Sequence, residues 1–212
     1  MDYRRTYRAA AVSFADLVSR LPADRWDGPG LGDWTLRELV GHTVSSALRQ
    51  VPPVLAATGA TVTLGAPQDY WAFARSAPPE LHAAATAASS ADARETGKWL
   101  GDAAADRVGE LAGLATAALA ATGDDDVVTT AAGGMRVRDW LPTRTFELVV
   151  HGMDLAAAAE VPFDLPPEVV AEAVTLASRI AVAVGDGGLV LRALTGRGTL
   201  PEHFSVLSTT RP

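Results

Sequence analysis

The sequence predicts an all-α protein built as a helical bundle, and three observations lead to this fold class. Apolar residues make up 48% of the chain, and many of them are alanines in runs such as residues 83–85 and 156–159. Alanine has the highest helix propensity, so these runs favour helices over strands. Apolar side chains also recur every three or four positions over long segments, which is the period of an amphipathic helix. Aromatic residues account for only 6%, so we expect leucine, valine and alanine to form most of the core.

Two helices are expected in the N-terminal part of the chain. Residues 3–21 carry one apolar stripe at helical spacing. Thr35 and Glu38 have the spacing of a capping box, in which two side chains satisfy backbone N–H groups at the start of a helix. A second helix is therefore predicted over residues 36–56. Pro52-Pro53 are expected to disturb its last turn or to end it early.

The middle of the chain is expected to contain a loop followed by a long helix. Residues 58–78 are rich in glycine and proline, with a short helix predicted near residues 70–73. The next helix is expected to start at Pro78-Pro79 and to reach Ala121, with a break near Ser89-Ser90 as one alternative. Residues 127–130 and 135–137 then form either a small hairpin or a polar loop, and the pattern favours neither.

The last part of the chain predicts two more helices and a tail. One helix covers residues 139–160, with Asp139 as its N-cap, and another covers residues 168–184. Residues 185–212 are rich in glycine, threonine and serine, and we expect an irregular or β-containing tail with one or two short strands. The predicted organisation is one helical-bundle domain, residues 1–184, with a C-terminal tail, residues 185–212, packed on it.

Composition excludes several classes of function. The formal net charge of −7 repels phosphate backbones, so no nucleic acid is expected as a partner. No apolar run approaches the roughly 20 residues of a membrane helix, so no membrane interaction is expected. The chain has no cysteine, which excludes a disulfide, a thiolate metal site and a cysteine nucleophile. The polar N-terminus does not look like a signal sequence. We expect a cytoplasmic protein, either a monomer or a homodimer.

A row of polar residues on one predicted helix carries the strongest chemical signal. His151 lies four residues after Glu147, so both side chains project from one helix face about one turn, roughly 6 Å, apart. Arg144 and Asp154 extend this row by three residues in each direction. The surrounding residues are mostly apolar, and a polar row that faces a core needs an internal partner. Arg144 either positions an anionic group of a substrate or pairs with Asp154.

A divalent metal ion would supply that partner. Imidazole nitrogen and carboxylate oxygen suit zinc, nickel or iron, and His42 on another helix would complete a three-ligand site with Glu147 and His151. Positions left open on the metal would accept water or substrate. Asp154, or a backbone carbonyl, could accept the remaining N–H of a liganded imidazole. The alternative is an ordinary surface pair of Glu and His. The other histidines, His82 and His203, are expected to be exposed.

Two motifs resemble a known family. They are Gly32-Asp-Trp34-Thr-Leu-Arg-Glu-Leu-Val-Gly-His42 and Arg144-Thr-Phe-Glu147-Leu-Val-Val-His151-Gly-Met-Asp154-Leu. Both resemble the mycothiol-dependent maleylpyruvate isomerase family, one of the DinB-like metal-binding bundles. The segment from Gly196 to Ser205 also resembles the closing segment of short members. The resemblance implies a DinB-like four-helix bundle and a metal, most of all zinc, held by His42, Glu147 and His151. It also implies mycothiol as cosubstrate.

Two departures from the family bear on the reaction. Met153 stands where the family usually has tryptophan, which would reshape the pocket wall. The full isomerase carries an additional C-terminal domain with substrate contacts, whereas this sequence ends at Pro212. We therefore expect a metal-dependent thiol S-transferase that joins a low-molecular-weight thiol to a small electrophile, with Arg144 and Asp154 as catalytic residues. The alternatives are an isomerase or hydrolase that works without thiol, and a non-catalytic bundle.

Overall fold

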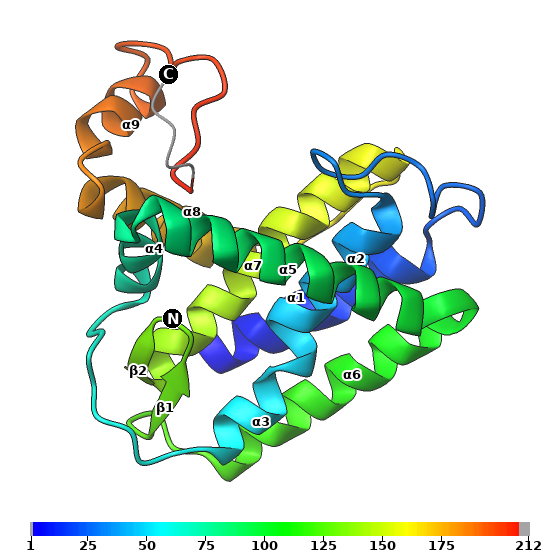
Figure 1. Cartoon of the computed structure of the whole chain (residues 1–212). Helices are drawn as coiled ribbons and strands as arrows, with labels where there is room; N and C mark the ends of the chain where they lie inside the picture. Colours follow the sequence, from blue (N-terminus) through cyan, green and yellow to red (C-terminus); the bar gives the residue numbers. More distant parts are fainter. Residues whose placement is uncertain (1, 208–212) are drawn as a thin grey trace.

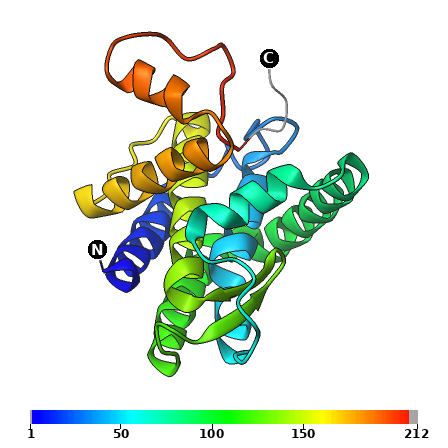
Figure 2. The same ribbon diagram turned by 90° about the vertical axis from the view of Figure 1, so that its left-hand side faces the viewer.

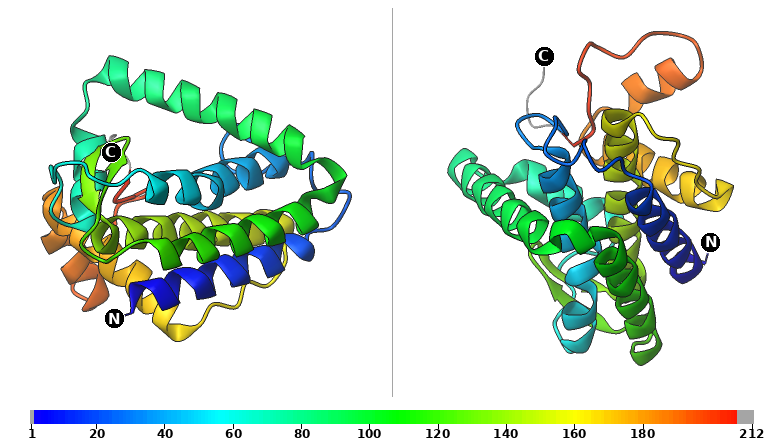
Figure 3. Two further views of the ribbon diagram at one scale, coloured as in Figure 1. Left: turned by 90° about the horizontal axis from the view of Figure 1, so that it is seen from below. Right: turned by 90° about the vertical axis from the view of Figure 1, so that its right-hand side faces the viewer.

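The computed structural model describes residues 2–207, and these form an all-α bundle with one small two-stranded sheet (Figure 1). Four helical segments make up the bundle: α1 (Tyr3–Ser19), α2 (Leu36–Val44) with its continuation, α6 (Ala104–Ala118) and α7 (Val137–Ala159). Helix α1 packs against both α6 and α7, and α2 packs against α7 (Figure 3). The predicted fold class is confirmed. None of the helices in this described part is long and apolar enough to cross a membrane.

Helix α1 follows its apolar stripe as predicted, with Tyr7, Phe14 and Leu17 fully buried. Helix α2 starts with the predicted capping box, because the Thr35 side chain accepts from the backbone of Glu38 and the Glu38 side chain accepts from the backbone of Thr35. These two helix starts required only local sequence information, and both were predicted correctly.

The segment after α2 differs from the prediction. The helix neither runs regularly nor ends early, but widens into a π-helical turn, η1 (Ser45–Arg49), and then continues as α3 (Val51–Ala56). Pro52 and Pro53 lie in the first turn of α3, where a missing N–H costs little. Because prolines cannot donate to the carbonyls of the preceding turn, the regular α-helical pattern gives way there.

Helix α5 (Pro79–Leu100) runs along α2, preceded by the short helix α4 (Pro67–Ser76). The two long helices approach closely at Gly41 of α2, since a side chain there would collide with the backbone of Ala93 and Gly97. The helix predicted from Pro78-Pro79 to Ala121 is divided into α5 and α6, and the break lies at Gly101 and not at the alternative position near Ser89-Ser90. The φ of +52° at Gly101 is easily adopted only by glycine.

Of the two alternatives for this segment, the hairpin is the one that forms: β1 (Val127–Thr130) pairs with β2 (Gly133–Arg136) in antiparallel register, and β2 begins two residues earlier than the pattern suggested. Strand β2 leads directly into α7, so Arg136 occupies the N-cap position. The prediction of Asp139 as N-cap is therefore wrong. Pro142 consequently lies inside the helix and not in its first turn.

Helix α8 (Pro167–Ala183) is confirmed and packs on α1, α4 and α7. The tail then forms a helix, α9 (Gly187–Leu194), which packs on α8 and stands off the bundle (Figure 2). From residue 195 to residue 207 the tail is irregular. The short strands expected there are not found in this described part, because leucine and alanine at residues 189–194 favour a helix once the chain has turned at Gly185.

Candidate metal centre

Three side chains from two bundle helices meet inside the molecule. His42 comes from α2, and Glu147 and His151 come from one face of α7. One nitrogen or oxygen atom from each lies within 4.8 Å of the other two. Nε2 of His151 is 3.2 Å from Oε2 of Glu147, and Nε2 of His42 is 3.8 Å from the same oxygen. The fold thus brings together the three residues that the sequence analysis proposed as ligands.

Each imidazole also has a separate partner for its other nitrogen. Nδ1 of His151 is 3.2 Å from Oδ2 of Asp154, and Nδ1 of His42 is 3.1 Å from Oγ of Ser89. Both Nε2 atoms are therefore left to face Glu147. This is the usual arrangement of histidines that bind a metal, in which a hydrogen bond to one nitrogen fixes the ring and its tautomer while the other nitrogen coordinates.

Charge and burial at the cluster are consistent with a bound cation. Glu147 is only 8% exposed. Burial alone would raise the pKa of Glu147, but the imidazoles of His151 and His42 and the charge of Arg144 hold it well below its usual value. Burial likewise lowers the pKa of His151, yet hydrogen bonds to Asp154 and Glu147 outweigh it and raise the pKa to about 9. The buried carboxylate of Glu147 therefore stays ionised, and its negative charge favours a cation beside it.

The aromatic surroundings hold the His42 ring. The rings of Trp34 and His42 are 4.8 Å apart between centroids, and His42 meets His151 edge to face at the same distance. The indole N–H of Trp34 donates to Ser90 on α5. Trp34 therefore packs against the imidazole of His42.

Arg144 lies in the predicted row but does not pair with Asp154. It is 1% exposed, donates from one terminal nitrogen to the carbonyl of Ser46 at 2.8 Å, and stacks over the ring of Tyr70 at 4.9 Å. No carboxylate forms an ion pair with it among the described residues. The pairing alternative is wrong, because the Asp154 carboxylate is already taken by His151 one turn further along α7.

Two other predictions can be compared with the structure. His82 and His203 are exposed, as expected. Met153 is 59% exposed, so it does not form the wall of a buried pocket as its position in the motif suggested.

The sequence analysis missed Ser89 as a partner of His42. No sequence pattern marks Ser89, because it lies in a run of small residues on a helix far from His42 in the chain. Only the packing of α5 on α2 brings it to His42.

These observations define a class of protein, an all-α bundle whose core holds two imidazoles and one carboxylate around a common point. Over residues 7–156, the chain matches the family described as the mycothiol maleylpyruvate isomerase N-terminal domain. The match covers more than half of the chain and includes all three residues of the cluster, so the chain belongs to this family. Comparison with curated proteins and with solved structures found no match.

Proposed function

We propose that this protein is a metal-dependent thiol S-transferase that uses mycothiol, and that His42, Glu147 and His151 hold the metal. The observation that carries the proposal is the convergence of their ligand atoms within 4.8 Å inside the bundle. Membership of the mycothiol maleylpyruvate isomerase family supports the thiol as cosubstrate. The second substrate is a small electrophile, and the proposed location is the cytoplasm.

The donor set fits a catalytic metal. Two imidazole nitrogens and one carboxylate oxygen are a typical ligand set of catalytic zinc, and three protein ligands leave a position for a substrate. Zinc is the metal we propose, with nickel and iron as alternatives that the same ligands accept. When bound, such an ion favours thiolate over thiol near neutral pH and so supplies a nucleophile. The chain itself has no cysteine, so the sulfur arrives with the cosubstrate.

The neighbouring residues have supporting roles. Asp154 holds Nδ1 of His151, and Ser89 holds Nδ1 of His42, which keeps both Nε2 atoms directed at the centre. Arg144 helps to keep Glu147 ionised and ties α7 to the carbonyl of Ser46 next to α2. Because Arg144 is buried and its bonds are internal, we assign it a positioning role. Asp154 is likewise a positioning residue.

A conjugation assay tests this proposal. Purified protein is given mycothiol and a panel of electrophiles, and the wild type is compared with His151→Ala and with the exposed-histidine control His82→Ala. We expect conjugation by the wild type and by the control, and its loss in His151→Ala. Equal activity in wild type and His151→Ala would end the proposal. Metal-dependent turnover in thiol-free buffer would instead favour a metal-dependent hydrolase or isomerase.

A further inference from the structure

A second cavity lies between helices α1, α4, α7 and α8. Its volume is about 330 Å³, and none of the three proposed metal ligands lines it. Its lining includes two carboxyl groups and four side chains with apolar surface: Asp139, Glu172, Tyr3, Pro67, Pro142 and Leu176. The cavity therefore combines an apolar wall with two acidic groups.

Glu172 on α8 has one carboxyl oxygen without a hydrogen-bond partner. It is 7% exposed, and its Oε2 accepts from the hydroxyl of Thr6 at 2.5 Å, whereas Oε1 is buried and makes no hydrogen bond with the described residues. The nearby hydroxyl of Thr145 donates to the carbonyl of Leu141. Burial raises the pKa of Glu172, although the hydroxyls of Thr6 and Thr145 oppose the rise. A buried acceptor without a donor costs free energy, so a ligand that brings a donor would gain by binding here.

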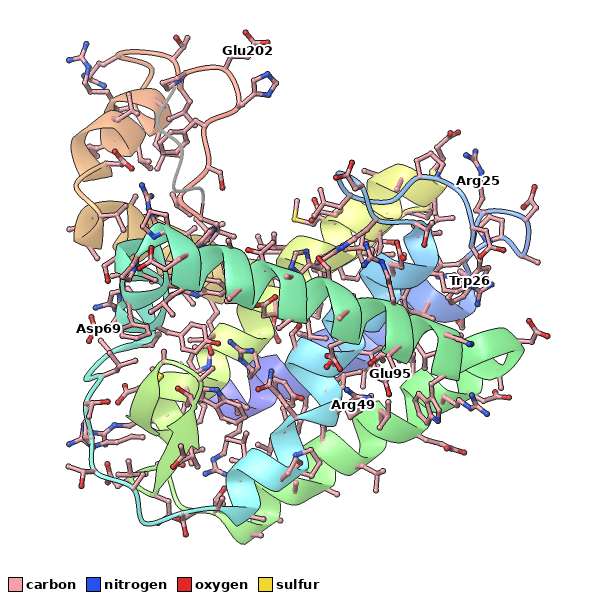
Figure 4. The ribbon with its side chains drawn as sticks, viewed as in Figure 1. Arg25, Trp26, Arg49, Asp69, Glu95 and Glu202 are labelled. Atoms are coloured by element: carbon pink, nitrogen blue, oxygen red, sulfur yellow. The ribbon has the colours of Figure 1, made fainter. Side chains whose placement is uncertain are left out.

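Asp139 on α7 provides a second oxygen of this kind. Its Oδ2 is buried and makes no hydrogen bond in the described part of the chain, since Nη1 of Arg136 is 3.9 Å away. Burial raises the pKa of Asp139, and the charges of Asp125 and Asp69 raise it further, against the effect of Arg138 and Arg136. Asp69 is labelled in Figure 4, where it lies beside the ribbon of α4. The cavity wall thus contains two buried carboxyl oxygens that lack donors.

The two arginines in the lining, Arg138 and Arg179, do not supply these donors. Neither bonds to Oδ2 of Asp139 or to Oε1 of Glu172. Arg138 is exposed and pairs with Asp125 at 2.5 Å, and Arg179 is exposed as well. Because water screens exposed charges, these arginines weaken the attraction of the acidic groups for a cation less than buried arginines would.

An organic ammonium group matches these acceptors. It carries three N–H donors and a positive charge, and hydrogen bonds between ionised groups are the strong ones. A metal ion fits less well, because it requires more ligands than two carboxyl groups. Among the described residues, the cluster of His42, Glu147 and His151 is the only set of three candidate ligands. The volume is also far larger than a water molecule or an ion needs, so an ammonium group has room for a hydrocarbon body.

The cavity continues into a groove that suits the hydrocarbon part of such an amine. The groove has a volume of about 620 Å³ and shares Thr175 and Arg179 with the cavity. Along it lie Val174 and Val182 of α8, which are 52% and 70% exposed. An apolar chain that leaves the cavity would cover these valines and remove apolar surface from water.

We propose that this cavity binds the ammonium group of a small organic amine, with Glu172 and Asp139 as acceptors and the hydrocarbon part along α8. The terminal torsion of a glutamate side chain is soft, so the free oxygen of Glu172 adjusts to a donor placed in the cavity. The site is separate from the proposed metal centre. Amine binding therefore does not depend on the proposed function, and either can fail without the other.

The direct test measures binding of phenethylamine to the zinc-loaded protein at pH 7 by ligand-observed NMR. Phenethyl alcohol and hydrocinnamate are the comparisons, since they carry the same ring with a neutral and an anionic group, and we expect the amine to bind in preference to both. Glu172→Gln keeps the size of the side chain and removes its charge, so amine binding should weaken at least about tenfold, while binding of the alcohol should change little. Glu168→Gln is the matched control, since it makes the same change at a solvent-accessible position one turn earlier on α8 and should leave amine binding unchanged.

Two further variants complete the test. Asp139→Asn should also weaken amine binding several-fold, and it keeps the test decisive if Glu172→Gln does not fold. His42→Ala should bind the amine like the wild type, because the amine does not bind at the metal. A loss of amine binding confined to the folded carboxyl variants supports the site. Undetectable amine binding by the wild type, equal binding by the wild type and both carboxyl variants, a preference for hydrocinnamate, or loss of amine binding in His42→Ala would each overturn it.

Discussion

At the scale of single residues, Asp154 orients one proposed metal ligand, the imidazole of His151. The hydrogen bond between Nδ1 and the carboxylate fixes the ring with Nε2 facing Glu147. Outer partners of this kind typically contribute 10- to 100-fold to metal affinity. We expect Asp154→Ala to weaken zinc binding by about this factor without unfolding the protein, as measured by competition with a chelator. Unchanged affinity would show that Asp154 does not orient the ligand.

The raised pKa of His151 gives a pH dependence with a defined sign. In the metal-free protein, the folded state binds this proton more tightly than the unfolded chain. Its contribution to stability is therefore complete below the ordinary value near 6.5 and is lost as pH rises through about 9. A metal must displace the same proton. We expect zinc affinity to increase about tenfold per pH unit between pH 7 and 9 and then to level off.

Calorimetry in buffers with different ionisation enthalpies checks this, since it counts the protons released on binding. About one proton should be released per zinc bound by the wild type at pH 7, because His151 is protonated there in the metal-free protein. Zinc binding at pH 7 without proton release would contradict the assignment of His151 as a ligand.

The sequence predicted the three clustered residues and Asp154 as the partner of an imidazole, but not the neighbours from α5. Glu147 and His151 are one turn apart on a single helix, so their spacing alone placed them together, whereas His42 was proposed as the third ligand from another helix and is supported by the motif that ends at His42. Ser89 and Asp92 belong to α5, and their distance from His42 depends on how two helices pack. No local pattern encodes that distance, so neither residue could be proposed in advance.

At the scale of elements, the prediction succeeded where residues close in sequence determine a helix, and it failed where packing between helices contributes. The stripe of α1, the capping box of α2 and the hydrophobic period of α8 each lie within a few turns of chain. The π-turn η1 precedes the local pair Pro52-Pro53, but its carbonyls also accept from the buried side chains of Tyr7 and Arg144 on other helices, which a local pattern does not contain. The break falls at Gly101, whose positive φ is easily adopted only by glycine, while Ser89 and Ser90 lie inside the continuous helix α5.

The contact between α2 and α5 permits a test at this scale. Gly41→Ala would drive a methyl group into the backbone of Ala93 and Gly97, so the helices must separate. We expect a loss of about 1–3 kcal/mol in the free energy of unfolding, measured by urea denaturation, because overpacking at a rigid contact costs this much. Gly113→Ala on α6 is the control, since a Cβ there meets no atom within 4 Å. Similar stability of both variants would contradict the close approach.

At the scale of the whole molecule, the centre joins two helices that are far apart in sequence. A metal held by His42 of α2 and by Glu147 and His151 of α7 would bind only the folded chain, so its binding energy would add to stability. With zinc at about 100 times its Kd, the gain is about 2.7 kcal/mol. We expect zinc to raise the melting temperature of the wild type by several degrees, and that of His42→Ala much less. The same increase in both proteins would place the stabilising metal elsewhere.

The central claim is that two imidazoles and one carboxylate hold a metal in the bundle, and metal content tests it most directly. The wild type, His42→Ala, Glu147→Ala and the control His82→Ala are purified without a metal-affinity tag, reconstituted with zinc and analysed by elemental analysis. The account predicts one metal per chain in the wild type and in the control, and a sharp loss in both other variants. Stoichiometric metal retained in both His42→Ala and Glu147→Ala would contradict it.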